Sequence, residues 1–457
     1  MNRRQLFVLI ATILGTSVAF LDGTIVNLAL PHIGADLHAD FAALQWIVDG
    51  YLLSLSALIL LGGSLGDIFG RKKIYLIGLV GFGISSLLCA LAPNATVLII
   101  VRVLQGIFGA LLTPGALSII NTNFPKELRS QAIGRWTAFG SIAIVAGPLA
   151  GGLILTVTSW RWIFLINLPI IIVCLLFAVP AIEESRDVRP RRVDFRGAGV
   201  AVLALAGITF GLIQGPVDHW RIGSVLPLLV GVLLAIYFVR LERQSKDPMV
   251  ELKLFKSRNF TGSNLMTFAM YGALSGFTFA LVIYLQTKMG YSSLAAGFSL
   301  LPVSVLMFLF AGRVGNLAGR FGPRMFLTAG PITSALGMAS LYFLTPGDSY
   351  WLHVMPGAVL FGIGLVLTVA PLTITVMSSV SDASSGIASG VNNAVARVAG
   401  LLVIAVLGLL GPNQVYQFAI TVSAGLALLS GVLSFLVIRN VAPSVRQIKP
   451  NHEALGS

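Results

Sequence analysis

Ionisable side chains lie within long apolar segments of the sequence at Asp22, Asp49, Arg102 and Arg397. A charged group is costly in the hydrocarbon core of a membrane, so its presence there indicates a functional site. Loss of water favours the neutral form of a carboxyl group, whereas a neighbouring arginine favours the ionised form. A carboxyl that meets arginine in only one conformation would bind and release a proton. We therefore predict proton coupling at Asp22, Asp49 and Arg102; a fixed buried ion pair is the alternative.

The depths of these three side chains would allow them to share one polar pocket. Asp22 lies nine residues before Pro31, which places it roughly 13 Å from the outer end of its segment at 1.5 Å per residue. Asp49 and Arg102 come near the starts of their segments, and the same rise places each roughly 8–9 Å deep. All three are thus expected in the outer half of the membrane.

Membrane-spanning segments must position these groups. Hydrophobic residues make up 56% of the 457 residues and charged residues 10%, whereas a soluble domain carries about 25% charged residues. The apolar runs are continuous and about 18–25 residues long, which suits helices that cross a hydrocarbon layer of roughly 30 Å. We predict an all-α polytopic membrane protein with fourteen spans, near residues 6–30, 44–65, 74–92, 96–118, 132–155, 162–180, 197–215, 223–239, 259–285, 292–311, 325–345, 351–377, 388–410 and 416–438.

The net charge of +13 follows the connections between these spans. On one side of the predicted membrane the loops hold only three basic residues, Arg161, Arg221 and Lys288. An excess of Lys and Arg marks cytoplasmic loops, so we predict that both termini are cytoplasmic. The positive charge is then topological, and the expected partner is the lipid bilayer and not nucleic acid.

Neither a metal site nor a catalytic centre is indicated by the sequence. Cys89 and Cys174 lie in predicted spans at opposite heights, and the five histidines are scattered. No nucleophile motif, phosphate-binding loop or long soluble segment is present, so we expect no enzyme or receptor, no cofactor and no metal. The first apolar run carries Asp22 and lacks a small-residue cleavage site, which indicates a retained span and not a signal peptide.

Two charged stretches, residues 181–196 and 240–258, bracket a pair of spans and divide the chain. Two six-span repeats around a central cavity are a recurrent transporter design. The predicted domains are a six-helix bundle at 1–180, cytoplasmic linkers with two accessory spans at 181–258, a second six-helix bundle at 259–440 and a cytoplasmic tail at 441–457.

A loop motif, GSLGDIFGRKK at residues 63–73, supports that division because GNLAGRFGPR repeats its spacing at residues 315–324. The second copy has Gly319 in the place of Asp67. An acid at a helix end can face the positive N-terminus of a neighbouring helix, and a glycine permits a tight turn. We predict a cytoplasmic gate loop, although an ordinary basic loop is the alternative. Its residues are Gly63, Asp67, Gly70 and Arg71.

The fifth predicted span contains GPLAGG, Gly147–Gly152. A proline kinks a helix and glycines allow close packing. We predict a hinge at Gly147, Pro148, Gly151 and Gly152, with helix packing alone as the alternative.

The last six spans contain no Asp or Glu, and their polar residues include amides, Ser, Thr and Arg397. Flexible Met and aromatic side chains suit a permissive apolar site, although lipid-facing helices contain them too. The predicted lining of a substrate cavity is Asn27, Gln105, Asn264, Tyr271, Gln286, Asn392 and Arg397.

These motifs give the chain a family resemblance. It resembles the major facilitator superfamily, specifically the fourteen-span drug/proton antiporter branch. The resemblance rests on five segments in the expected order, LDGTIVNLALP at 21–31, the loop at 63–73, LIIVRVLQGIFGA at 98–110, GPLAGG at 147–152 and WRWIFLINLP at 160–169. In this family the arginine of the fourth span, here Arg102, is implicated in proton coupling, and the fifth-span motif is associated with exporters.

The resemblance implies the major facilitator fold, two six-helix bundles plus two extra helices. It also implies a proton-coupled antiporter in a bacterial inner membrane that exports small lipophilic, often monocationic, molecules. A dedicated carrier of one metabolite, such as an amino acid, sugar or siderophore, remains the alternative. We expect a monomer that is driven by the proton gradient.

Overall fold

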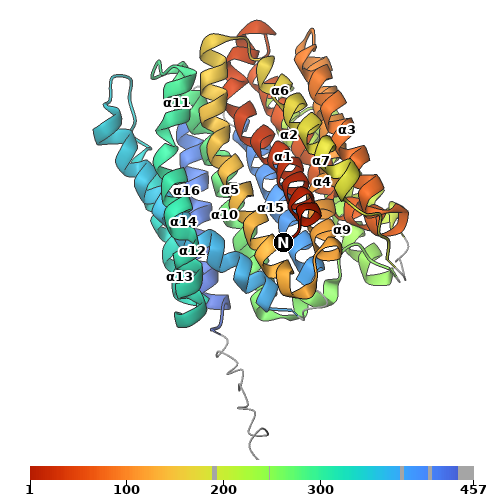
Figure 1. Cartoon of the computed structure of the whole chain (residues 1–457). Helices are drawn as coiled ribbons and strands as arrows, with labels where there is room; N and C mark the ends of the chain where they lie inside the picture. The colour runs from red at the N-terminus through yellow and green to blue at the C-terminus, as the bar shows by residue number, and fades with distance from the viewer. Residues whose placement is uncertain (188–192, 246, 381–384, 410–413, 441–457) are drawn as a thin grey trace, which may run out of the picture.

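The computed structural model describes residues 1–187, 193–245, 247–380, 385–409 and 414–440, and every regular element among them is helical (Figure 1). The first elements are α1 Arg3–Asp36, α2 Phe41–Phe69, α3 Arg71–Ala90, α4 Ala95–Asn123, α5 Lys126–Val157, α6 Trp162–Leu165 and α7 Asn167–Ala181. The middle elements are α8 Phe195–Val217, α9 Ile222–Gln244, the 3-10 helix η1 Leu252–Lys256, α10 Arg258–Thr287, α11 Ser293–Ser299 and α12 Leu301–Phe321. The last are α13 Pro323–Ser340, the π-helical turn η2 Tyr350–Val354, α14 Met355–Ser378, α15 Ser385–Leu407 and α16 Val415–Val437.

Twelve helical segments in the described part are long and apolar enough to cross a membrane. They coincide with twelve of the predicted spans, which confirms an all-α polytopic membrane protein. The predicted fifth and eleventh spans coincide with α5 and α13, which are not among the twelve. The described apolar part of α5 is short, Gly147–Val157, whereas α13, with 18 residues, is long enough but not apolar enough.

Three of the predicted spans consist of two abutting helical pieces: α6 with α7, α11 with α12, and η2 with α14. Two of the junctions have a local cause. Pro302 and Pro356 stand at the start of α12 and α14, where a missing N–H costs nothing because the first turn leaves its N–H groups unpaired anyway. A helix can therefore begin again at these points.

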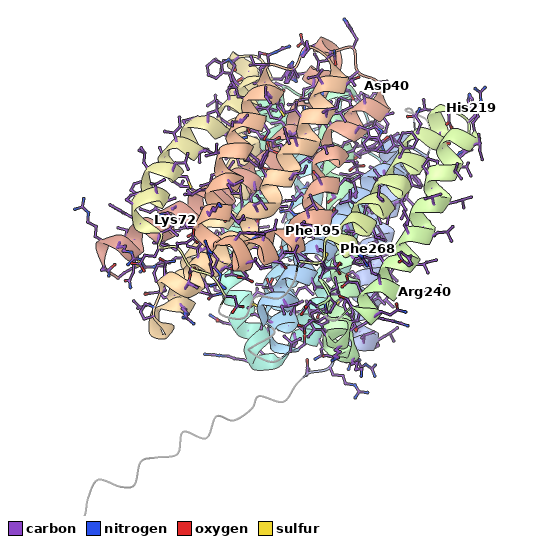
Figure 2. The ribbon with its side chains drawn as sticks, turned by 90° about the vertical axis from the view of Figure 1, so that its right-hand side faces the viewer. Asp40, Lys72, Phe195, His219, Arg240 and Phe268 are labelled. Carbon is purple, nitrogen blue, oxygen red and sulfur yellow. The ribbon has the colours of Figure 1, made fainter. Side chains whose placement is uncertain are left out.

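The long helices pack as two groups with a peripheral pair. Helices α1–α5 and α7 contact one another and form the first bundle; α10 and α12–α16 contact one another and, with α11, form the second bundle. Helices α8 and α9 pack on each other, and α8 also contacts α2 and α15. Figure 2 shows this pair at the edge of the molecule, with His219 and Arg240 near its two ends.

The hydrophobic core shows how the two bundles meet. We call the half that holds the N-terminus of α1 the near half, and the half that holds the α1–α2 connection the far half (Figure 1). In the far half one cluster of buried residues includes members of both bundles, such as Ile25 and Phe277. In the near half the bundles have separate clusters, one around Tyr75 in the first bundle and two in the second, around Phe260 and around Phe326. The apolar contact between the bundles is therefore concentrated at the far end.

Glycines allow α2 and α4 to approach backbone to backbone. A methyl group on Gly62 would collide with the carbonyl of Ala110, and one on Gly106 would collide with the carbonyl of Tyr51. Because small residues are needed where helices cross closely, the glycine of the fourth-span motif has a packing role. This contact fixes the position of Tyr51 beside Arg102 of α4.

Candidate functional site

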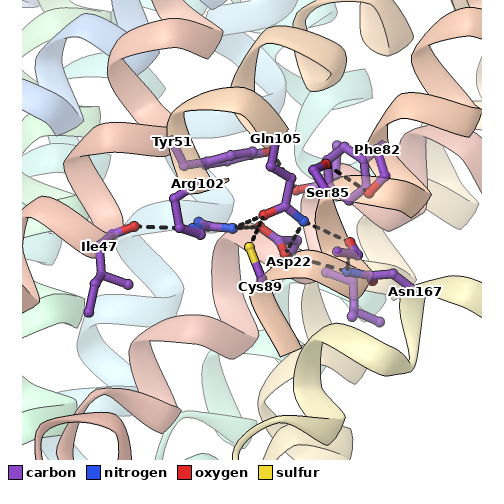
Figure 3. Close-up of polar contacts among 12 residues, drawn as sticks. Asp22, Ile47, Tyr51, Phe82, Ser85, Cys89, Arg102, Gln105 and Asn167 are labelled. Atoms are coloured by element: carbon purple, nitrogen blue, oxygen red, sulfur yellow. Dashed lines mark hydrogen bonds and ion pairs between the residues drawn. The ribbon is translucent and has the colours of Figure 1, made fainter. Parts of the chain in front are cut away.

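A buried ion pair joins α1 and α4. The Nη1 atom of Arg102 lies 2.6 Å from Oδ2 of Asp22, and the two side chains are 1% and 0% exposed (Figure 3). The same nitrogen donates to Oε1 of Gln105 at 2.6 Å, and Nε donates to the carbonyl of Ile47 at 3.1 Å. Three oxygens from three helices thus surround one guanidinium, which compensates for its removal from water.

Amides and a hydroxyl complete the environment of Asp22 (Figure 3). Its Oδ1 atom accepts from Nε2 of Gln105 at 3.2 Å and from Nδ2 of Asn167 at 3.4 Å. Both amides also donate to Oγ of Ser86, at 2.8 and 3.1 Å. The site therefore gathers α1, α2, α3, α4 and α7, and among the described residues every donor to Asp22 other than Arg102 is neutral.

An aromatic ring covers the guanidinium. Cζ of Arg102 lies 4.3 Å from the ring centroid of Tyr51 and 5.8 Å from that of Phe164. A cation over an aromatic face is stabilised most where water is excluded. Tyr51 and Phe164 therefore help to hold Arg102 in place.

Only part of this network is among the residues predicted from the sequence. Asp22, Arg102 and Gln105 belong to the predicted set, whereas Ser86 and Asn167 do not. Asn167 falls in the segment WRWIFLINLP, where a lone amide between apolar residues was a usable signal. A serine in an apolar span gives no such signal because it can bond its own helix backbone.

Asp49 does not join the pair. It is 0% exposed, and both carboxyl oxygens are without a hydrogen-bond partner among the described residues. Of the three residues predicted to couple protons, Asp22 and Arg102 thus form a pair, whereas the carboxyl group of Asp49 lies apart from them. A buried polar group without a partner is rare and calls for a functional explanation.

The predicted gate loop is compact and anchored by residues from the end of α7. Asp67 lies 2.7 Å from Arg71, and Gly70 has a φ of 113° that favours glycine. The carboxylate of Glu184 accepts from the backbone N–H groups of Lys72 and Lys73, both at 3.1 Å. Glu184, which is not among the residues predicted from the sequence, therefore caps the N-terminus of α3 and complements its dipole.

The second copy of the loop is built in the same way. Gly322 has a φ of 87°, and the side-chain oxygen of Asn440 accepts from the backbone N–H of Arg324 at 3.1 Å. In each bundle a polar residue just past the last long helix thus caps the helix of the third span. Glu184 follows α7 and caps α3, and Asn440 follows α16 and caps α13. The repeat predicted between residues 63–73 and 315–324 is therefore present in three dimensions.

Replacing Glu184 by alanine is expected to loosen the first turn of α3 by about 1 kcal/mol, the usual cost of losing a helix cap. Hydrogen exchange at the amides of Lys72 and Lys73 should accelerate about fivefold. The matched control is Glu183→Ala, whose carboxylate is 72% exposed and pairs with Arg4. Equal exchange in the Glu184 variant and the wild type would show that this carboxylate does not cap α3.

The predicted hinge residues lie where the first bundle meets α11. A methyl group on Gly147 would meet Oγ1 of Thr24, and one on Gly152 would come within 2.8 Å of Cα of Leu294. From the other side, Gly297 leaves room for the carbonyl of Pro148. The GPLAGG segment therefore packs closely against α1 and against the second bundle, and its role as a hinge stays a prediction.

The predicted lining of the substrate cavity falls into separate places. Gln105 belongs to the Asp22 network, and Oδ1 of Asn27 is buried without a hydrogen-bond partner in the described part of the chain. Asn392 donates to Asn264 at 3.2 Å and to Thr267 at 2.7 Å. These two amides form a polar cluster between α10 and α15 in the near half.

Two further predicted residues of the second bundle reach the first bundle. Cζ of Arg397 lies 5.8 Å from the ring centroid of Phe20 on α1, and Nε2 of Gln286 donates to the carbonyl of Leu28 at 2.9 Å. Tyr271 packs against the near-half cluster of the second bundle. Of the predicted lining residues, Arg397 and Gln286 thus contact the opposite bundle.

Comparisons with known proteins agree with this architecture. The Major Facilitator Superfamily profile matches residues 12–404. The chain is 34% identical over 410 residues to the multidrug resistance protein Stp of Mycobacterium tuberculosis, covering 89% of this chain and 76% of that protein. It is 32% identical over 409 residues to the tetracenomycin C resistance and export protein of Streptomyces glaucescens, with the same coverage, 89% and 76%.

The fold also matches solved structures. The crystal structure of the POT family transporter PepTSo superposes with a TM-score of 0.72 at 16% identity and covers 96% of this chain and 98% of that one. At this identity the match concerns the fold alone. With the profile match over most of the sequence and relatives above 30% identity, the chain belongs to the Major Facilitator Superfamily.

Proposed function

We propose that this chain is a proton-coupled antiporter that exports small lipophilic, often monocationic, molecules by alternating access. The observation that carries the proposal is the fully buried pair of Asp22 and Arg102 inside a major facilitator bundle. Membership of the family makes the chain a transporter and not an enzyme. Two similar proteins, a multidrug resistance protein and a tetracenomycin C export protein, support export as the direction and drugs as the substrate class.

The proposed topology has fourteen spans, which adds α5 and α13 to the twelve apolar helices. Both termini are cytoplasmic, because Lys and Arg concentrate in the loops of the near half. The membrane is the bacterial inner membrane. In this orientation the bundles are packed together on the outer side, which corresponds to an inward-facing state of the transport cycle.

The proposed domains are the bundles at 1–180 and 259–440, the accessory region at 181–258 and a cytoplasmic tail at 441–457. The separate near-half clusters of the two bundles and the peripheral position of α8 and α9 support this division. The tail lies outside the described residues. We propose that a monomer is the working unit because each bundle pairs with the other within one chain.

In the proposed cycle the proton gradient is the energy source, and no cofactor takes part. When the far end opens, a proton from outside binds Asp22 and cancels its ion pair with Arg102. Arg102 keeps its bonds to Gln105 and to the carbonyl of Ile47, so the cation stays in place while the acid is neutral. Return to the inward-facing state restores the pair and releases the proton. Asp49 is proposed as a second proton carrier because it is buried without a partner among the described residues.

The test uses purified protein in liposomes with an imposed pH gradient and a trapped pH dye. Lipophilic cations and neutral drugs are added in turn, and transport of a substrate is expected to dissipate the gradient. Liposomes without protein are the control. If no drug moves protons but an amino acid, sugar or siderophore does, the chain is a dedicated metabolite carrier and the proposal fails.

A further inference from the structure

A glutamine on α2 crosses from the first bundle to the second. Gln45 is 1% exposed, and its Nε2 atom donates to the carbonyl of Ile404 on α15, with the carbonyl of Ala405 at 3.4 Å. A buried amide must find partners because the loss of its hydrogen bonds to water is costly. Here it finds them across the boundary between the bundles.

The acceptors of Gln45 are available for a structural reason. The last four carbonyls of an α-helix have no partner within the helix, and α15 ends at Leu407, so Ile404 and Ala405 belong to that set. Gly408 follows directly, and a methyl group there would come within 2.7 Å of Oε1 of Gln45. The first bundle therefore caps the C-terminus of a helix in the second bundle.

A second glutamine crosses in the opposite direction. Gln286 on α10 donates to the carbonyl of Leu28 on α1 at 2.9 Å, and its Oε1 atom accepts from Oγ of Ser293 at 3.0 Å. A backbone carbonyl has two lone pairs, so the carbonyl of Leu28 can accept this bond in addition to one within α1.

These contacts are concentrated at one end of the molecule. In the part of the chain that the structure describes, the side-chain hydrogen bonds that cross between the bundles come from Gln45, Gln286 and Ser293, the last through a 3.5 Å contact with His32. All of them lie in the far half, beside the apolar cluster that the bundles share. Any opening of the far end must break them.

We propose that Gln45 and Gln286 are the two latch residues that hold the far end closed, each donating from one bundle to a backbone carbonyl of the other. This role rests on the proposed function, because alternating access requires the far end to open. Both latches are neutral, so their strength does not depend on a proton being bound to them. The two amides thus contribute to the equilibrium between the closed and the open far end. Proton binding at Asp22 and Asp49 acts on the same equilibrium separately.

The test measures the distance between the bundles in the full chain, in lipid and without substrate. Spin labels are placed on Ala35 of α1 and Lys288 after α10, both exposed at the far end; Cys89 and Cys174 are buried, and protein without the added cysteines controls for their labelling. Gln45→Leu and Gln286→Leu should each raise the open-to-closed ratio about fivefold, which is the effect of one net hydrogen bond, and the double variant should raise it further. The control is Gln214→Leu on α8, which should leave the distances unchanged.

A second variant separates a latch from simple packing. Gln45→Glu can donate to the Ile404 carbonyl only while its carboxyl group is protonated. At acidic pH the far end of this variant should be as closed as that of the wild type. At alkaline pH its open-to-closed ratio should exceed that of the wild type. Distance distributions equal to wild type in a folded double variant, or a Glu variant without added pH dependence, would overturn the proposal. Opening by the Leu variants in a protein that exports no drug would keep the latch and reject the drug substrate.

Discussion

Replacing Asp22 by asparagine is expected to abolish the proton movement that substrates drive, down to the level of liposomes without protein. Asparagine has nearly the same shape, and its oxygen can still accept from Arg102 and Gln105, so binding of substrate should remain. An amide does not take up a proton, so a cycle that depends on this position has no ion to exchange. Dye-reported proton flux and substrate binding, measured on one preparation, separate these two effects.

The matched control for this variant lies at the far end of the same helix. Asp36 pairs with Arg161 at 2.7 Å and accepts from Nε1 of Trp160 at 2.8 Å, but this pair is at the surface. Exposed ion pairs contribute about 0–1 kcal/mol, so Asp36→Asn should transport like the wild type. If Asp22→Asn retains full coupling, the proton carrier is Asp49 and the proposed role of Asp22 is wrong.

Replacing Arg102 by alanine is expected to have the largest effect on stability. It leaves Asp22 in an interior where the carboxylate has only neutral donors, and breaking a buried pair costs roughly 3–5 kcal/mol. The ring of Tyr51 also loses the cation beneath it. Thermal unfolding in detergent should show a clear decrease in melting temperature, and coupled transport should be lost. Arg161→Ala, which removes an exposed partner, should unfold at the wild-type temperature.

A lysine at the same position separates charge from geometry. Arg102→Lys keeps a positive charge beside Asp22, but an ammonium group cannot reproduce the planar fork that contacts Asp22, Gln105 and the carbonyl of Ile47 together. Stability should recover in large part, while the number of protons moved per substrate should fall. If Arg102→Lys couples as well as the wild type, only the charge of Arg102 matters and the fork has no role.

Much of the architecture could be predicted because the bilayer restricts what a chain can do. Hydrocarbon demands internally paired backbone, so each long apolar run had to be a helix. The same cost of burying charge singled out Asp22, Asp49, Arg102 and Arg397, and similar depths allowed the first three to share a pocket. The structure pairs Asp22 with Arg102 (Figure 3). Spacing alone also predicted the repeated loop, because a glycine with positive φ is required at both Gly70 and Gly322.

The rest depended on which face each helix turns toward its neighbours. Asp49 has a suitable depth, yet its carboxyl group does not reach Arg102 because α2 presents Tyr51 and the carbonyl of Ile47 to that side. Glu184 is distant from α3 in sequence, and only the return of the chain after α7 brings it to the helix end.

The sequence by itself determined the membrane helices, the acids and the arginine that they carry, and the turns of the repeated loop, because each follows from local burial cost or local backbone geometry. Only the tertiary structure decided which side chains meet across helices. The rotation of a helix about its axis is set by packing against several neighbours at once, and for that reason the latches of Gln45 and Gln286 became visible only in three dimensions.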